Sequence, residues 1–462
     1  MTRLFRMGAA ILLLPLVVAC SDNDNNNDDD EMMMPEPEPM AAPAELRVTH
    51  ASNNSPDVNV YVNGERALEN VAFKNTSGLI ELDAGTYEVE VRGILPDGSE
   101  TTVIGPVDLS FNEGERTDVF AIGDLANIQA NLLDPVAIEE GVSDVRISAL
   151  HAAFDVGTVD IYVTPPGADL MAFEPITAAF GDSAGPVSLE PDTEYQVRIA
   201  PQGSMTPVYT SPATTFSAGT ELVLAAVPNT YRVGSSPVTL LGVAAEGSFD
   251  VLDEDMGARV LVMHNSFDTP AVDLLVDGSE VEDKLEFGNS AIIEAPAGTY
   301  NFVVAADIDN NIAPIDLDLT LEAGWSYAAF AVGSFGDSSV EAILFNDDRR
   351  QIATAARLEV IHGSYNVAAT LPVDVYLTSD GVIADAEPAI AGLAYKESSG
   401  QLQVTPGDYW VTVTVAGDKA TVAFDSGGTL ALDAETNYKV VARDPSASEV
   451  GMPLILVSIL ED

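Results

Sequence analysis

The residues of this chain that could do chemistry recur at a regular spacing. All of its histidines occupy the same place in a repeated pattern: His50, His151, His264 and His362. Each ends an apolar alternation and precedes a polar corner that closes on Asp or Asn. A catalytic zinc site needs three protein ligands, whereas each repeat offers one histidine and no cysteine. We therefore predict a structural role, in which the ring nitrogens bond nearby backbone and the Asp or Asn four residues later.

Other reactive patterns have structural interpretations as well. Gly181-Asp182-Ser183-Ala184-Gly185 fits the serine hydrolase turn, but it occupies the polar turn that follows an aromatic residue in every repeat. One acidic or amide residue begins the second strand of each repeat: Asn59, Asp160, Asp273 and Asp374. We expect these side chains to cap a neighbouring loop rather than bind calcium. The sequence thus predicts no catalytic residue, no metal site and no cofactor.

Short strands must position these residues. In each repeat the histidine closes a first strand, and a second alternating strand follows at 58–62, 159–163, 272–276 or 373–377. In the first repeat Asn63-Gly64 then marks a hairpin, and residues 87–91 alternate strictly. Seven to eight such strands without a helical period predict an all-β chain of antiparallel, immunoglobulin-like β-sandwiches.

The same landmarks recur in order along the chain. An aromatic residue precedes the middle turn of each repeat: Phe73, Phe180, Phe287 and Tyr395. We therefore predict four tandem domains, at residues 45–134, 144–243, 258–347 and 356–462, each long enough to bury its own core. The second and fourth carry insertions after the second strand, an alternation that suggests duplication of an ancestral pair.

The amino-terminal residues have the pattern of an export signal. Arg3 and Arg6 precede an apolar stretch that ends directly before Cys20, the only cysteine. Residues 17–20 resemble a bacterial lipobox, so we predict a signal peptide at 1–19 and acyl chains on Cys20 that hold the protein in the membrane. Ser21 follows the cysteine where an aspartate would resemble an inner-membrane retention signal, so we predict the outer membrane as the destination. Residues 20–44 are acidic and rich in Asn and Pro, which predicts a disordered linker.

Composition excludes one class of partner. The chain of 462 residues has 73 acidic and 19 basic residues and a net charge of −54. Such a charge repels phosphate backbones, so we predict no nucleic-acid binding.

A family resemblance follows from the repeated motifs. Their order is a histidine strand, a V-D-V-Y-V-N-G-like strand, an A-G-T-Y turn and an F-A-V-G strand. This order resembles the domain-of-unknown-function family 4397, closely at 45–134 and 258–347 and more loosely at 144–243 and 356–462. The resemblance implies β-sandwiches in exported, surface-attached bacterial proteins, and it implies no activity.

Together these patterns predict a lipid-anchored protein of the outer membrane, facing the periplasm or the cell surface. We predict that it is not an enzyme but a structural, adhesive or ligand-binding protein, with a glycan or a protein as its ligand. Two alternatives remain open at this point. One is an enzyme or accessory subunit that acts on extracellular polysaccharide, and the other is a surface rod stiffened by calcium at the acidic linkers 250–255 and 347–348. The sequence indicates no oligomeric state.

Overall fold

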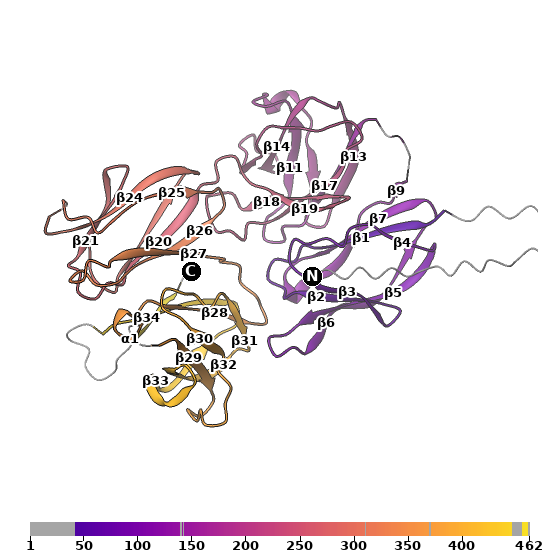
Figure 1. Ribbon diagram of the computed structural model, residues 1–462. Helices are drawn as coiled ribbons and strands as arrows, with labels where there is room; N and C mark the ends of the chain where they lie inside the picture. The colour runs from indigo at the N-terminus through magenta and orange to yellow at the C-terminus, as the bar shows by residue number, and fades with distance from the viewer. Residues whose placement is uncertain are drawn as a thin grey trace, which may run out of the picture. The chain divides into compact units, whose positions relative to one another are not determined.

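The computed structural model describes residues 42–138, 141, 143–309, 311–368, 371–445 and 455–460. More than half of these residues lie in strands and very few in helices, which confirms the all-β prediction (Figure 1). Their helical structure is confined to α1 (Tyr365–Ala368) and two 3₁₀ turns, η1 (Leu125–Asn127) and η2 (Leu170–Ala172). The predicted signal peptide, Cys20 and most of the linker lie outside the described residues. Ala44, assigned to the linker, already belongs to the first strand.

The first two repeats contain nineteen strands. The first has β1 (Ala44–His50), β2 (Val58–Val62), β3 (Glu65–Val71), β4 (Ile80–Leu82), β5 (Gly85–Ile94), β6 (Glu100–Phe111), β7 (Glu115–Ile122), β8 (Gln129–Leu132) and β9 (Val136–Ala137). The second has β10 (Val145–His151), β11 (Val159–Thr164), β12 (Ile176–Ala178), β13 (Ser183–Leu189), β14 (Glu194–Pro201), β15 (Tyr209–Thr210), β16 (Thr214–Thr215), β17 (Glu221–Pro228), β18 (Val238–Ala244) and β19 (Gly247–Val251). Strands β9 and β19 lie beyond the predicted boundaries at residues 134 and 243.

The other two repeats follow the same order. The third has β20 (Ala258–His264), β21 (Val272–Val276), β22 (Ser279–Leu285), β23 (Ser290–Ala295), β24 (Gly298–Ala306), β25 (Ile315–Leu321), β26 (Ser326–Val332) and β27 (Glu341–Asn346). The fourth has β28 (Ala356–His362), β29 (Val373–Thr378), β30 (Ile390–Leu393), β31 (Leu402–Val404), β32 (Gly407–Val415), β33 (Asp418–Leu432), β34 (Thr436–Arg443) and β35 (Ile455–Leu460).

Each repeat divides its strands between two sheets. The first-strand sheet, which contains the histidine strand, has the order β4-β1-β7-β8 in the first repeat and β23-β20-β26-β27 in the third. The other sheet has the order β3-β2-β5-β6 or β22-β21-β24-β25. The prediction of antiparallel sheets needs one correction, because the histidine strand pairs parallel with the late strand in all four repeats: β1 with β7, β10 with β17, β20 with β26 and β28 with β34.

Each repeat encloses an apolar core between its two sheets, and we call each such unit a sandwich. In the first sandwich Leu46 and Val119 pack against Val60 and Val91 from the facing sheet. Equivalent cores lie in the other three sandwiches. By its contacts the segment from Ala42 to Asp462 is nevertheless one compact unit, so the division into four domains stays a prediction.

A second type of core explains this compactness. Phe120 and Ile122 alternate with the inward-facing residues of β7, yet both are fully buried, because they pack against Leu150, Val223 and Leu241 of the second sandwich. We call this cluster the interface core. The first-strand sheets of the third and fourth sandwiches pack in the same way, around residues that include Leu261, Met263, Phe330, Ile361 and Val441.

Ion pairs accompany both sheet-to-sheet contacts. Arg47 Nε lies 2.5 Å from Asp118 Oδ1, with both side chains buried, and Arg116 Nη1 lies 2.7 Å from Glu221 Oε2 of the second sandwich. Between the third and fourth sandwiches, Lys439 Nζ lies 3.0 Å from Asp347 Oδ1. Several of the few basic residues of this acidic chain thus lie where sandwiches meet.

Candidate functional site

The four histidines lie in four different sandwiches, so they do not form one site. Each is 0–1% exposed at the end of its first strand. Nε2 of His50, His151 and His264 lies 3.0 Å from the carbonyl oxygen of the residue six positions later. Because a carbonyl can only accept, each of these rings donates through Nε2. The predicted bonds to nearby backbone are therefore present at these three histidines.

His50 and His264 use their second ring nitrogen too. Nδ1 accepts the backbone N–H of Ser52 at 3.3 Å and of Ser266 at 3.4 Å, respectively. A neutral imidazole bonded at both nitrogens has no free lone pair for a metal ion or for a proton. Burial supports this state, since it lowers the pKa of His50 to about 4 despite the opposing bond to Pro56. These two corners are therefore unsuited to general base catalysis.

In three repeats the aromatic residue before the middle turn packs against the corner histidine. Phe73 packs edge-on against His50 with ring centroids 6.2 Å apart, and Phe287 and Tyr395 pack likewise on His264 and His362. The residue after the aromatic donates its backbone N–H to the histidine carbonyl in every repeat. That residue has a positive φ, whether it is Gly181 and Gly288 or Lys74 and Lys396. The sequence Gly181–Gly185 begins in this turn, which agrees with its structural interpretation.

At two of the corners one predicted contact is wrong. The side chain of Asn54 accepts the N–H of Leu125 at 2.8 Å rather than bonding His50. Asp268 similarly accepts from Ser334 Oγ and from the N–H groups of Phe335 and Gly336, at 2.7–3.0 Å. Parallel pairing of the first and late strands explains the difference, because it brings the loop after the late strand beside the corner. These side chains join the two loops.

The side chains at the start of the second strand do cap neighbouring loops. Asp160 accepts Gly203 N–H at 2.7 Å, and Asp374 accepts the N–H groups of Gly392 and Gly417 at 2.7 and 2.8 Å. Asn59 and Asp273 also accept backbone N–H groups. This agrees with the prediction for these residues.

The structure also gathers three carboxylates that the sequence analysis did not connect. One oxygen each of Asp273, Asp283 and Asp307 lies within 4.8 Å of the others. Asp283 and Asp307 are exposed, and carboxylates meet often on a chain of net charge −54. No second feature of the described residues indicates a cation here, so we assign no metal to this cluster.

The acidic linkers are occupied by the protein's own cations. Asp250 Oδ1 lies 2.7 Å from Lys74 Nζ, and Asp348 Oδ2 lies 2.7 Å from Arg357 Nη2. Burial disfavours the charged form of Asp348, but the hydrogen bond and charge of Arg357, together with the N–H and charge of Arg350, outweigh this and hold its pKa below the usual range. Asp250 and Asp348 are thus paired with basic side chains of the protein itself.

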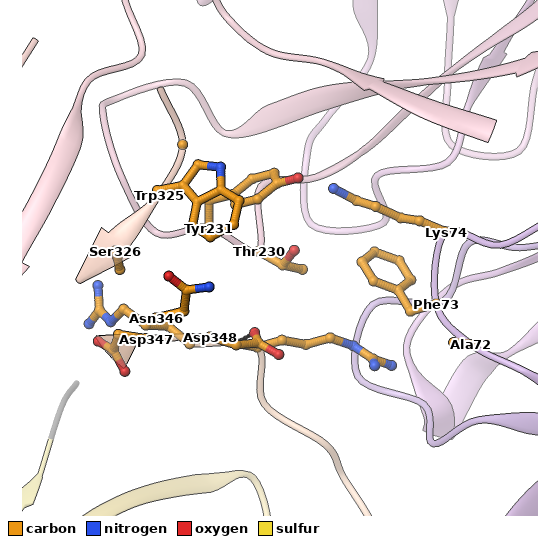
Figure 2. A pocket seen from close by; sticks show the side chains of 13 residues that line it. Ala72, Phe73, Lys74, Thr230, Tyr231, Trp325, Ser326, Asn346, Asp347 and Asp348 are labelled. Carbon is orange, nitrogen blue, oxygen red and sulfur yellow. Dashed lines mark hydrogen bonds between the residues drawn. The ribbon is translucent and has the colours of Figure 1, made fainter. Parts of the chain in front are cut away.

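A cleft of about 390 Å³ lies where three sandwiches and a linker meet (Figure 2). Residues 72–74 of the first sandwich, 230–231 of the second, and 324–326 and 346–350 of the third and its following linker form its walls. We call it the junction cleft. Its volume falls within the range of about 300–1,000 Å³ that is usual for small-molecule sites.

Aromatic rings form two sides of the junction cleft. The ring of Trp325 stacks on Tyr327 with an interplanar angle of 24°, and the residue is still 41% exposed. Tyr231 lies beside Trp325, and Phe73 lies on the opposite side (Figure 2). Lys74 Nζ lies 4.4 Å from the centroid of the Tyr231 ring, so one face of that ring is occupied. The indole of Trp325 is therefore the most accessible aromatic surface.

Charged residues of the cleft are engaged with protein groups. Arg350 Nε donates to the carbonyl oxygen of Asn53 at 2.8 Å, and its guanidinium lies 4.8 Å from the Phe73 centroid. Burial lowers the pKa of Arg350 to about 10, which leaves it charged at neutral pH. Arg349 Nη1 donates to the Arg232 carbonyl oxygen at 3.2 Å. These cations hold the sandwiches together.

Sequence reasoning did not find this cleft. Phe73 and Trp325 are about 250 residues apart and share no motif. The one local signal is the pair Trp325-Ser326 after Gly324, where the first repeat has Glu115-Arg116 after Gly114. An exposed tryptophan at a turn that is polar elsewhere could have indicated a site.

Two parts of the chain match the model of a known protein family. The model of the domain of unknown function DUF4397 matches residues 44–162 and 258–376, together just over half of the chain. The chain belongs to this family. Each DUF4397 match covers one sandwich and the first two strands of the next, so it contains two histidine corners.

The chain also aligns with solved structures at low similarity. The Bacillus anthracis TIE protein is 12% identical with a TM-score of 0.14, and the alignment covers 87% of this chain and 69% of that one. A candidate cell adhesion protein from Bacteroides uniformis is 10% identical with a TM-score of 0.19, covering 45% and 99%. No curated protein matches. Scores this low carry no argument about architecture or function.

Within the described residues, no helix is long and apolar enough to span a membrane.

Proposed function

We propose that this DUF4397 protein is an exported lipoprotein that is held to the outer membrane through Cys20 and binds a ligand in the junction cleft without catalysing a reaction. The observation that carries the binding role is Trp325, a 41% exposed indole supported by Tyr327 in a cleft between sandwiches. An aromatic surface that is already held in place loses little conformational freedom when a ligand packs on it.

The acidic residues of the cleft favour binding over catalysis. A general acid at neutral pH needs a carboxyl group whose pKa is raised. Asp348 has the opposite shift, because Arg357 holds its pKa low. Asp347 lies 3.0 Å from Lys439 Nζ and also contacts Arg259. Asp348 is therefore suited to accept hydrogen bonds rather than to transfer protons, and Asp347 is engaged by basic side chains.

Membrane attachment is tested at Cys20. We expect the wild-type protein to partition with outer membranes and the Cys20→Ser protein to appear in the soluble fraction, because acyl chains on that residue are the anchor. Membrane fractionation with immunoblotting measures this, and mass spectrometry of the wild-type amino terminus checks the acylation. A soluble wild-type protein that keeps residues 1–19 would contradict the proposal.

Ligand binding is tested with the same soluble variant. The Cys20→Ser chain should bind isolated cell envelopes, and the additional change Trp325→Ala should reduce the bound fraction at least about tenfold, as expected for a central aromatic contact. Phe173→Ala is the matched control, since Phe173 is 39% exposed and does not line the cleft. Equal binding by all three chains would refute the cleft as the binding site. Release of soluble sugar from the envelopes would instead support the enzyme alternative.

A further inference from the structure

We propose that the junction cleft binds a neutral saccharide, whose sugar ring stacks on Trp325 and whose hydroxyl groups bond the uncommitted polar side chains around it. This inference rests on the proposed function and names the ligand class of the same site.

The first argument is the aromatic surface. A pyranose ring presents a face of C–H groups, which are apolar and slightly positive, while the face of an aromatic ring is electron-rich. Tyr327 stacks beside Trp325, with ring centroids 6.2 Å apart, and is itself only 7% exposed. Its hydroxyl oxygen accepts the N–H of Glu322 at 3.1 Å. The indole thus packs beside a buried, hydrogen-bonded ring and offers a flat, accessible surface to a sugar ring.

The second argument is the supply of hydrogen-bonding groups. The hydroxyl of Ser326 is buried and has no hydrogen-bond partner in the described part of the protein, although Ser326 lines the cleft and is 5% exposed. A buried polar group without a partner costs about 1–3 kcal/mol, which a ligand hydroxyl can recover. The side chains of Thr230 and Asn346 also line the cleft, and the amide of Asn346 lies centrally beneath the aromatic rings (Figure 2).

The third argument is charge. The cleft contains three basic residues, Lys74, Arg349 and Arg350, and two acidic ones, Asp347 and Asp348, and the cations are engaged by protein groups such as Asp250 and the carbonyl oxygens of Asn53 and Arg232. An anionic sugar would have to compete with these partners, and the chain's net charge of −54 would repel it. A neutral saccharide avoids this repulsion. The volume of about 390 Å³ accommodates roughly one or two sugar rings at the lower end of the usual range for ligand sites.

The test uses the mature Cys20→Ser chain in isothermal titration calorimetry. The probes are cellotetraose, maltotetraose, xylotetraose, mannotetraose and chitotetraose, with tetragalacturonate as the anionic comparison. We expect at least one neutral probe to bind, with an affinity that changes less than about twofold between 0.1 and 1 M NaCl, because neutral ligands are not screened. Trp325→Ala should weaken it at least about tenfold.

Further variants separate a binding role from a structural one. Asn346→Ala should weaken binding about threefold to tenfold through the loss of a hydrogen bond, and Phe173→Ala should leave it unchanged. All variants should melt within a few degrees of the parent chain, because Trp325, Phe173 and Asn346 are all exposed residues.

Different results would contradict the saccharide as ligand and the cleft as binding site. No binding of any neutral probe at 10 mM would overturn the saccharide inference. Binding of tetragalacturonate alone, lost in Trp325→Ala, would also overturn it while supporting the cleft as a ligand site. Absence of binding both to the probes and to isolated envelopes would overturn the inference and the proposed function together.

Discussion

Phe120→Ala should lower the free energy of unfolding of a two-sandwich fragment, residues 42–257, by about 3–5 kcal/mol, the usual cost of truncating a buried phenylalanine. Phe120 is fully buried in the interface core, most of whose residues belong to the second sandwich. In a one-sandwich fragment, residues 42–138, the same residue faces solvent, and the substitution should cost less than about 1 kcal/mol. Urea denaturation of both fragments, with and without the substitution, measures the difference.

This comparison also tests whether the predicted domain at 45–134 folds alone. The one-sandwich fragment keeps its own core and should still fold, with lower stability and with Phe120 and Ile122 exposed. Phe173→Ala in the longer fragment is the control, and it should cost less than about 1 kcal/mol because Phe173 is 39% exposed. Equal losses for Phe120→Ala in both fragments would mean that the residue stabilises its own sandwich and that the interface core contributes nothing.

Acidification should remove the contribution of the buried histidines to stability. Burial lowers the pKa of His50, and likewise of His362, to about 4. In the unfolded chain the value is near 6.5. Between these pH values the unfolded chain binds protons that the folded chain does not, so the free energy of unfolding falls as the pH falls from about 6.5 to about 4. The contribution is complete above pH 6.5. Its size is about 3 kcal/mol per histidine, at about 1.4 kcal/mol for each pKa unit.

The variant His50→Gln isolates this effect from the many carboxylates, which titrate in both chains. At pH 7 the wild type should be more stable by about 1–3 kcal/mol, because the variant disturbs the bonds to Pro56 and Ser52. That advantage should shrink by up to about 3 kcal/mol by pH 4 in guanidinium titrations. Parallel stability curves would contradict the prediction. A rise in wild-type stability on addition of Zn²⁺ would show instead that the ring nitrogens are available to metal.

The sequence predicts much of the fold because landmarks repeat. A histidine at the end of the first strand and an aromatic residue before the middle turn are in contact in the structure, and their recurrence locates the strands between them. The contact between sandwiches does not follow from the repeated landmarks, but residues 260–263 and 120–122 carry a signal for it. Their continuous apolar character indicates burial on both faces. The cleft could not be predicted, because Phe73, Tyr231 and Trp325 come together only when separate sandwiches pack.

The parallel pairing of first and late strands determines the order in which the chain can complete its sandwiches. Leu46 pairs with Thr117, and Leu358 with Tyr438, so the centre of each first-strand sheet joins residues about 70–80 positions apart. Contacts this distant in sequence form slowly, because a long loop must close before they contribute stability. During synthesis from the amino terminus, a sandwich therefore stays incomplete until its late strand has emerged. The interface core, and the equivalent cluster between the third and fourth sandwiches, can form only after the late strand of the later sandwich has also emerged. Most of a repeat is therefore synthesised before the central strands of its first-strand sheet can pair.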